Sequence, residues 1–130
     1  MGDYRRLGVW VKAHEVTLAV YRQTAGFPPG ERYGLTAQIR RSAVSLGSNL
    51  VEGSGRRSDG DMRRFLQIAR GSLCELQYQL LLARDLEYVS RETWDALAAR
   101  SDEVGRMLTG LGAYMTTRHD ARSGWRGRKS

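Results

Sequence analysis

The sequence has few of the features that mark a secreted, membrane-spanning or disulfide-bonded protein. Its single cysteine, Cys74, cannot form an internal disulfide, which fits a reducing compartment. No apolar run reaches the roughly 20 residues that a membrane-spanning helix needs. Arg5 and Arg6 are not followed by an apolar stretch, so no signal peptide is expected. The prediction is a cytoplasmic protein that does not engage a membrane.

Proline is also scarce, because the 130 residues contain only Pro28 and Pro29, side by side. Most of the chain is therefore free of the strongest helix breaker. Strand-like alternation and internal repeats are absent from the sequence as well. The length suits one domain, and a chain of this size can bury one core without disulfides.

Signatures of catalysis are missing too. His14 and His119 lie far apart in the sequence, and Cys74 has no histidine near it. No paired ligand spacing such as H-x-x-x-H or C-x-x-C predicts a metal site. The glycine-rich stretch 53–55 lacks the Lys-Ser/Thr ending of a phosphate-binding loop, so we interpret it as a helix stop. We expect a non-enzymatic protein with no catalytic residues, no metal and no cofactor.

What the chain does contain is helical periodicity. Apolar residues recur at helical spacing in four segments: about residues 7–25, 31–52, 58–87, and 90 onward. Glycine or proline separates the first three segments. The predicted core positions are Val9, Ala13, Val16, Val20, Leu35, Ile39, Ala43, Leu46, Leu50, Met62, Phe65, Ala69, Leu73, Leu76, Leu80, Ala83, Trp94, Leu97, Ser101, Val104, Leu108, Leu111 and Met115. Four amphipathic helices with short connections favour an all-α, antiparallel up-down four-helix bundle over residues 1–117.

The net charge of +7 is distributed unevenly along the chain. Residues 40–70 hold seven arginines against three acidic residues, a net charge of +4, whereas residues 71–117 carry −3. Residues 118–130 carry +4 and show no apolar stripe. We therefore predict that residues 118–130 form a flexible basic tail outside the bundle.

Clustered arginines make nucleic acid the predicted partner, since they can neutralise phosphates. The candidate nucleic-acid-binding residues are Arg40, Arg41, Arg56, Arg57, Arg63, Arg64 and Arg70. Trp125, among the basic residues of the tail, is a candidate for stacking on a base. Alternatively, the arginines form a solvated face, or their abundance reflects a GC-rich genome. In a further alternative they pair with Glu52 and Glu75 across subunits, which describes a protein–protein adaptor.

A polar stripe borders the apolar face of the second segment. At about 100° per residue, five polar side chains share this flank: Gln38, Ser42, Ser45, Asn49 and Glu52. We interpret them as a hydrogen-bonded polar seam against another helix or subunit, because small serines permit close approach. The alternative is ordinary solvated helix surface.

The third segment carries more apolar side chains than one bundle readily covers. Around residues 78–83 they point to most sides of the helix. Large exposed apolar patches usually mark interfaces, so we predict an oligomer interface containing Ile68, Leu81, Leu82 and Leu86. The alternative is a wide core-facing stripe.

Several ordered blocks of residues resemble a known family. The blocks are Val9-Trp10-Val11-Lys12-Ala13, Phe27-Pro28, Arg32-Tyr33-Gly34-Leu35-Thr36, Gln38-Ile39-Arg40-Arg41-Ser42-Ala43-Val44-Ser45, Ser48-Asn49-Leu50-Val51-Glu52-Gly53, Arg64-Phe65-Leu66, Ile68-Ala69 and Gly71-Ser72-Leu73-Cys74-Glu75-Leu76. Over roughly residues 7–115 the chain resembles the bacterial four-helix-bundle proteins encoded within intervening sequences of 23S rRNA genes. In one departure, Gly47 stands where that family often has proline.

The resemblance implies a ring-like homopentamer of four-helix bundles. It also implies partners, because a related accessory protein of diversity-generating retroelements binds nucleic acid and a reverse transcriptase. From residues and resemblance together we predict a homo-oligomeric scaffold that engages RNA or DNA, with a protein such as a reverse transcriptase as a further partner.

Overall fold

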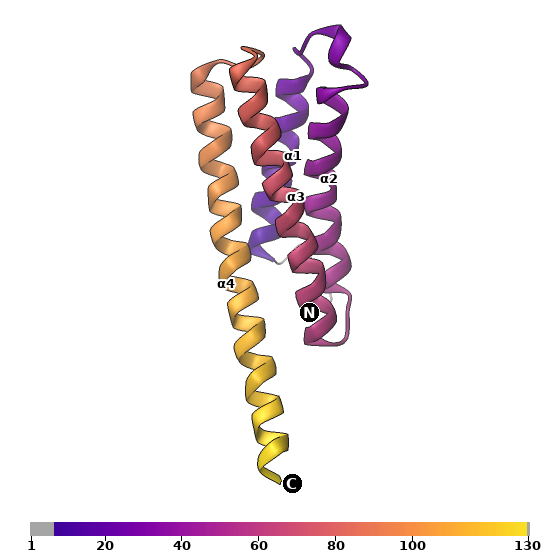
Figure 1. Ribbon diagram of the computed structural model, residues 1–130, viewed down its shortest axis with the longest axis vertical. Helices are drawn as coiled ribbons and strands as arrows, with labels where there is room; N and C mark the ends of the chain where they lie inside the picture. The colour runs from indigo at the N-terminus through magenta and orange to yellow at the C-terminus, as the bar shows by residue number, and fades with distance from the viewer. Residues whose placement is uncertain (1–6, 130) are drawn as a thin grey trace.

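The computed structural model describes the backbone of residues 7–129 and the side chains of residues 7–117. Its elements are α1 (Gly8–Thr24), the 3₁₀ turn η2 (Pro29–Glu31), α2 (Leu35–Ser54), α3 (Asp59–Asp85) and α4 (Arg91–Lys129), and the described residues include no strand (Figure 1). α1 and α3 each pack against both α2 and α4 but not against each other, so they occupy diagonal corners. This arrangement confirms the predicted four-helix bundle.

Both ends of the bundle are closed by short connections. The α1–α2 and α3–α4 connections lie together at one end, and the α2–α3 connection lies at the other (Figure 1). At the second end Ser58 Oγ accepts a hydrogen bond of 3.1 Å from Asp61 N, which caps α3 where the sequence predicted its start.

The predicted start of the second helix, near Glu31, is four residues early. Residues Pro29–Glu31 form a 3₁₀ turn instead, and α2 begins at Leu35. Glu31 Oε1 accepts a hydrogen bond of 3.3 Å from Leu35 N. The Glu31 carboxylate, which precedes α2 in the chain, therefore pairs with the first backbone N–H of that helix. A Cβ on Gly34 would lie 2.7 Å from Glu31 Oε1, so glycine permits this close approach.

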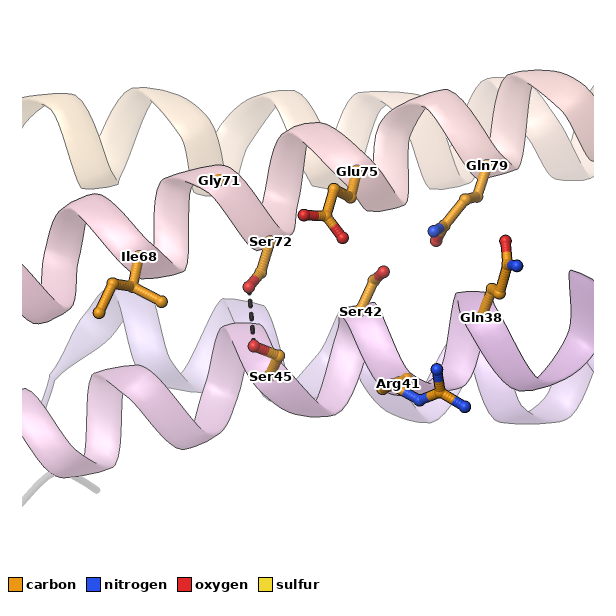
Figure 2. A pocket seen from close by; sticks show the side chains of 9 residues that line it. All are labelled: Gln38, Arg41, Ser42, Ser45, Ile68, Gly71, Ser72, Glu75 and Gln79. Atoms are coloured by element: carbon orange, nitrogen blue, oxygen red, sulfur yellow. Dashed lines mark hydrogen bonds between the residues drawn. The ribbon is translucent and has the colours of Figure 1, made fainter.

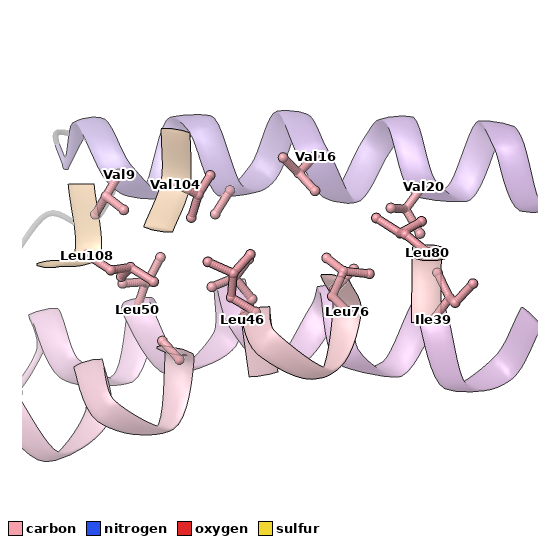
Figure 3. Packing of buried hydrophobic residues seen from close by; sticks show 14 of the residues in the cluster. Val9, Val16, Val20, Ile39, Leu46, Leu50, Leu76, Leu80, Val104 and Leu108 are labelled. Carbon is pink, nitrogen blue, oxygen red and sulfur yellow. The ribbon is translucent and has the colours of Figure 1, made fainter. Parts of the chain in front are cut away.

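The core follows the four predicted stripes closely. Figure 3 shows its antiparallel order, with Val9 of α1 near Leu50 of α2 at one end and Val20 near Ile39 at the other. One prediction for α3 is wrong: Phe65 is half-buried, and Leu66 enters the core in its place. Phe65 lies instead at the α2–α3 junction, close to Gly53. A Cβ added to Gly53 would lie 3.1 Å from the Cβ of Phe65.

In α4 the predicted stripe is mostly buried. Trp94 and Leu111 are half-buried and pack on the rim of the core, whereas Leu97, Val104, Leu108 and Met115 are inside it. Ser101 is fully buried, and its hydroxyl has no hydrogen-bond partner among the described residues.

The backbone of residues 118–129 continues α4 as helix beyond the other three helices (Figure 1), where the sequence suggested irregular chain. Once packed turns have nucleated a helix, each added residue gains one hydrogen bond, and no proline interrupts this stretch. The side chains of this segment, including Trp125, lie outside the described residues. The division between bundle and flexible tail at Thr117 stays a prediction. Over the described part of the chain, no helix combines the length and apolar character needed to cross a membrane.

Candidate functional site

The seven arginines of residues 40–70 point to different sides of the bundle. Arg40 lies between α1 and α2, where its Nε donates a hydrogen bond of 2.8 Å to Thr24 Oγ1. Its guanidinium carbon also lies 4.6 Å from the centre of the Tyr21 ring. Arg41, one residue later, lines the opposite flank of α2. Arg40 therefore has a structural role in α1–α2 packing, and Arg41 is exposed.

A second group surrounds Phe65 at the α2–α3 end of the bundle. The guanidinium carbons of Arg56 and Arg64 lie 4.7 and 5.3 Å from the centre of its ring. Arg56 also forms a 3.3 Å ion pair with Glu52, one turn earlier in the chain. Arg57 is exposed in the connection between the helices.

The third group lies in a groove between α3 and α4. Arg70 Nη2 donates a hydrogen bond of 2.6 Å to Thr109 Oγ1, and Arg63 Nη1 donates one of 3.5 Å to Thr116 Oγ1. Two cavities of about 450 and 500 Å³ lie along this groove and share Arg70 and Thr109 in their linings. The α4 side of this groove was not predicted from the sequence, although Thr109 and Thr116 are spaced at the seven-residue interval that puts two side chains on one helix face.

The predicted polar seam lies between α2 and α3. The hydroxyls of Ser45 and Ser72 share a hydrogen bond of 2.8 Å, and Ser42 is only 5% exposed (Figure 2). Asn49 Nδ2 donates to the backbone oxygen of Ser45 at 2.8 Å and to its hydroxyl at 3.2 Å. Serine on both helices leaves an open cavity of about 650 Å³ above these contacts.

The two ends of the predicted seam are different. Gln38 is exposed and lies opposite Gln79 across the groove (Figure 2). Glu52 is also exposed, and its described partner is Arg56 of the following connection rather than a residue of α3. Among these five side chains, the described hydrogen bond to α3 is that of Ser45, whereas Ser42 is buried and Asn49 bonds back to its own helix.

The predicted interface residues do not share one face of α3. Leu82 packs against the core, Ile68 lines the cavity between α2 and α3, and Leu86 is the residue that follows α3. Ile68 and Leu86 are each 45% exposed, whereas Leu81 and Leu82 are half-buried. An apolar band, which the sequence reasoning missed, lies on the outer faces of α1 and α2. It contains Val11, Leu18, Tyr21 and Val44. Val11 and Leu18 are seven residues apart and lie opposite the core stripe of α1. Helical periodicity in the sequence could therefore have identified them as exposed apolar positions.

Titration and metal binding add little to the site. Among the described residues, no three His, Cys, Asp or Glu side chains come together as metal ligands would. The pKa of Tyr88 is raised above its usual value, first by its hydrogen bond to Glu31, then by burial and by the charge of that carboxylate. Tyr88 belongs to the connection between α3 and α4, which lies at the opposite end of the bundle from the α2–α3 connection (Figure 1).

Comparisons with known proteins place these features in context. A family model described as "23S rRNA-intervening sequence protein" matches residues 5–110. A crystal structure from Bacteroides thetaiotaomicron is similar, with 25% identity and a TM-score of 0.75 over 81% of this chain and 95% of the other. That structure is described as a protein with unknown function from the S23 ribosomal protein family. No curated protein matches the chain.

Proposed function

The chain belongs to the family of 23S rRNA-intervening sequence proteins, and we propose that it is a non-enzymatic, oligomeric binding protein that engages RNA or DNA through its arginines. The observation that carries the proposal is uncompensated charge. Among the described side chains, Arg56 is the one member of the seven-arginine set that pairs with a carboxylate. Arg63 and Arg70 are held by threonine hydroxyls, which orient a guanidinium without neutralising it.

Uncompensated arginines favour a polyanionic partner. Releasing counterions from a nucleic acid makes such contacts favourable at moderate salt, and backbone contacts carry little sequence information. The sequence adds a net charge of +4 in residues 118–130, which follow the bundle directly. Binding should therefore be strongly salt-dependent and weakly sequence-specific.

Self-association would multiply these contacts. Exposed apolar side chains occur on two different surfaces, Val11 and Leu18 on α1 and Ile68 on α3, and these two helices occupy diagonal corners of the bundle. Two different faces that join head to tail generate a closed ring when the rotation closes. The resemblance suggests five subunits, and a ring would repeat each arginine group once per subunit, so that modest contacts combine by multivalency.

A binding titration at two salt concentrations tests the proposal. It compares the intact chain, a version ending at Thr117, and a version with Arg56, Arg57, Arg63 and Arg64 changed to Glu. We expect the intact chain to bind RNA or DNA, truncation to weaken binding without abolishing it, and charge reversal to remove it. Charge-reversed protein that still assembles and binds as tightly as the intact chain would exclude these arginines as the site.

The alternative function is a protein–protein adaptor. Its structural support is the packing of Arg40 on Tyr21 and of Arg56 and Arg64 on Phe65, since these arginines already have roles within the fold. Failure of the intact chain to bind either nucleic acid at low salt would favour this alternative. Co-purification from the native host would then identify the partner, for which a reverse transcriptase stays a prediction.

A further inference from the structure

Polar pairs bridge α3 and α4 at a regular interval. Arg63 contacts Thr116, Arg70 contacts Thr109, and Gln77 Nε2 donates a hydrogen bond of 3.1 Å to Asp102 Oδ1. Each step advances seven residues along α3 and retreats seven along α4. Seven helical residues rise about 10.5 Å, so successive pairs are about two turns apart.

The chemistry of this ladder changes along its length. The Gln77–Asp102 pair contains a carboxylate, whereas the Arg70–Thr109 and Arg63–Thr116 pairs contain only cations and hydroxyls. Arg63 Nε is buried and has no hydrogen-bond partner among the described residues, so one N–H donor of this guanidinium is unpaired. Anion-binding capacity is therefore concentrated in the two arginine pairs.

The groove between these pairs is open because α4 presents small side chains there. Gly112 and Ala113 line its floor beside Arg63, and Gly105 lines the adjoining cavity together with Arg106. A linear partner can approach the guanidinium groups without displacing a large side chain. The groove ends beside Thr116, where α4 continues past the other helices toward the basic residues 118–130 (Figure 1).

We infer that the α3–α4 groove binds the sugar-phosphate backbone of one nucleic-acid strand, with Arg63 and Arg70 each on a phosphate and the strand running toward the extension of α4. The inference rests on the proposed function and specifies where on the molecule it occurs. Two cationic pairs on one side of the bundle can each meet a phosphate of the same strand. The planar, five-donor fork of arginine suits a phosphate better than a lysine ammonium does.

The experiment uses the full chain and a fluorescein-labelled oligothymidylate, with binding measured by anisotropy over a series of salt concentrations. The test variant is Arg63→Gln/Arg70→Gln. The matched control is Arg22→Gln/Arg100→Gln, which removes the same charge from two exposed arginines on the α1–α4 side of the bundle. We expect the test variant to bind about tenfold more weakly, and its plot of log K against log salt to be shallower by about 1.5, the effect of two lost phosphate contacts. The control should change both quantities much less.

A third variant, Arg63→Lys/Arg70→Lys, keeps the charge and removes the fork. It should retain the salt slope of the intact chain and lose affinity, and thermal melting of all variants shows whether the bundle is folded. If both glutamine variants weaken binding equally, the nucleic acid is held by diffuse charge and the groove assignment is wrong, although the proposed function survives. If the intact chain binds no oligonucleotide, the proposed function itself fails.

Discussion

The phenolic hydroxyl of Tyr88 donates a hydrogen bond of 2.9 Å to Glu31 Oε2, across 57 residues of sequence. The other oxygen of the same carboxylate accepts from Leu35 N at the start of α2. The ring of Phe27 completes this cluster, 5.4 Å from the Tyr88 ring. One carboxylate thus links the α1–α2 connection to the α3–α4 connection and fixes the end of the bundle remote from the arginine pairs.

This link predicts a pH dependence above the usual tyrosine range. Because the pKa of Tyr88 is raised above 10.0 in the fold, the folded state holds the proton more tightly than the unfolded chain does. The stability from this group is complete below the unfolded pKa and is lost as pH rises through the folded pKa. Tyr88→Phe should melt at a lower temperature than the intact chain near neutral pH, and the gap should shrink above about pH 10.

The matched control for that series is Tyr78→Phe, since Tyr78 is mostly exposed on α3. Its melting temperature should follow that of the intact chain at every pH. A constant gap between Tyr88→Phe and the intact chain from neutral to strongly alkaline solution would show that the hydroxyl contributes nothing through its protonation.

Glu87 offers a site for stabilisation, because it ends α3 in the left-handed conformation with a φ of 63°. Tyr88 N donates to Ala83 O and Glu87 N to Arg84 O, each at 2.9 Å, which is the Schellman pattern that glycine usually completes. Glu87→Gly should raise the free energy of unfolding by about 1 kcal/mol in urea titrations, since a side chain in this conformation costs about 1–2 kcal/mol. Glu87→Ala keeps the strain and should show no comparable gain.

The sequence predicted the helices and core well, but not how the arginines are distributed. Periodicity identified the buried stripes because each requires only its own helix. Neighbouring residues on a helix point about 100° apart, so Arg63 and Arg64 diverge, one to the α4 groove and the other to Phe65. The partners Thr109 and Thr116 depend on the register of α4 against α3, which side-chain packing sets and no local pattern encodes.

Asn49 and Glu52 should respond differently to the same replacement. Asn49 is half-buried and donates to Ser45, so Asn49→Leu should lower the free energy of unfolding by about 1 kcal/mol. Glu52 is exposed and pairs with Arg56 at the surface, so Glu52→Leu should change it by less than about 0.5 kcal/mol. Equal losses for the two variants, measured by urea titration, would mean that Glu52 is buried in the assembled protein.

Two glycines of α2 provide a second contrast. A Cβ at Gly47 would meet no heavy atom within 4 Å, whereas a Cβ at Gly53 would lie 3.1 Å from the Cβ of Phe65. Gly47→Ala should therefore stabilise the helix by about 0.5–1 kcal/mol. Gly53→Ala should lose that gain or destabilise the protein, because a Cβ attached to the backbone of α3 cannot swing aside. A stabilised Gly53→Ala variant in thermal melts would contradict the close approach of α2 and α3 at this end.

Self-association should depend on both apolar surfaces. If the α3 face of one subunit contacts the α1 face of the next, Ile68→Glu and Leu18→Glu should each disrupt assembly, since both side chains are more than 40% exposed. Light scattering coupled to size exclusion should give the intact chain a mass several times 14.6 kDa and each variant a smaller one. Mixing the two variants leaves one intact interface per pair, so the mixture should form heterodimers and nothing larger.

An intact chain that stays monomeric at micromolar concentration would refute assembly. If Leu18→Glu assembles normally while Ile68→Glu does not, the α3 face pairs with itself, and a two-fold dimer replaces the ring.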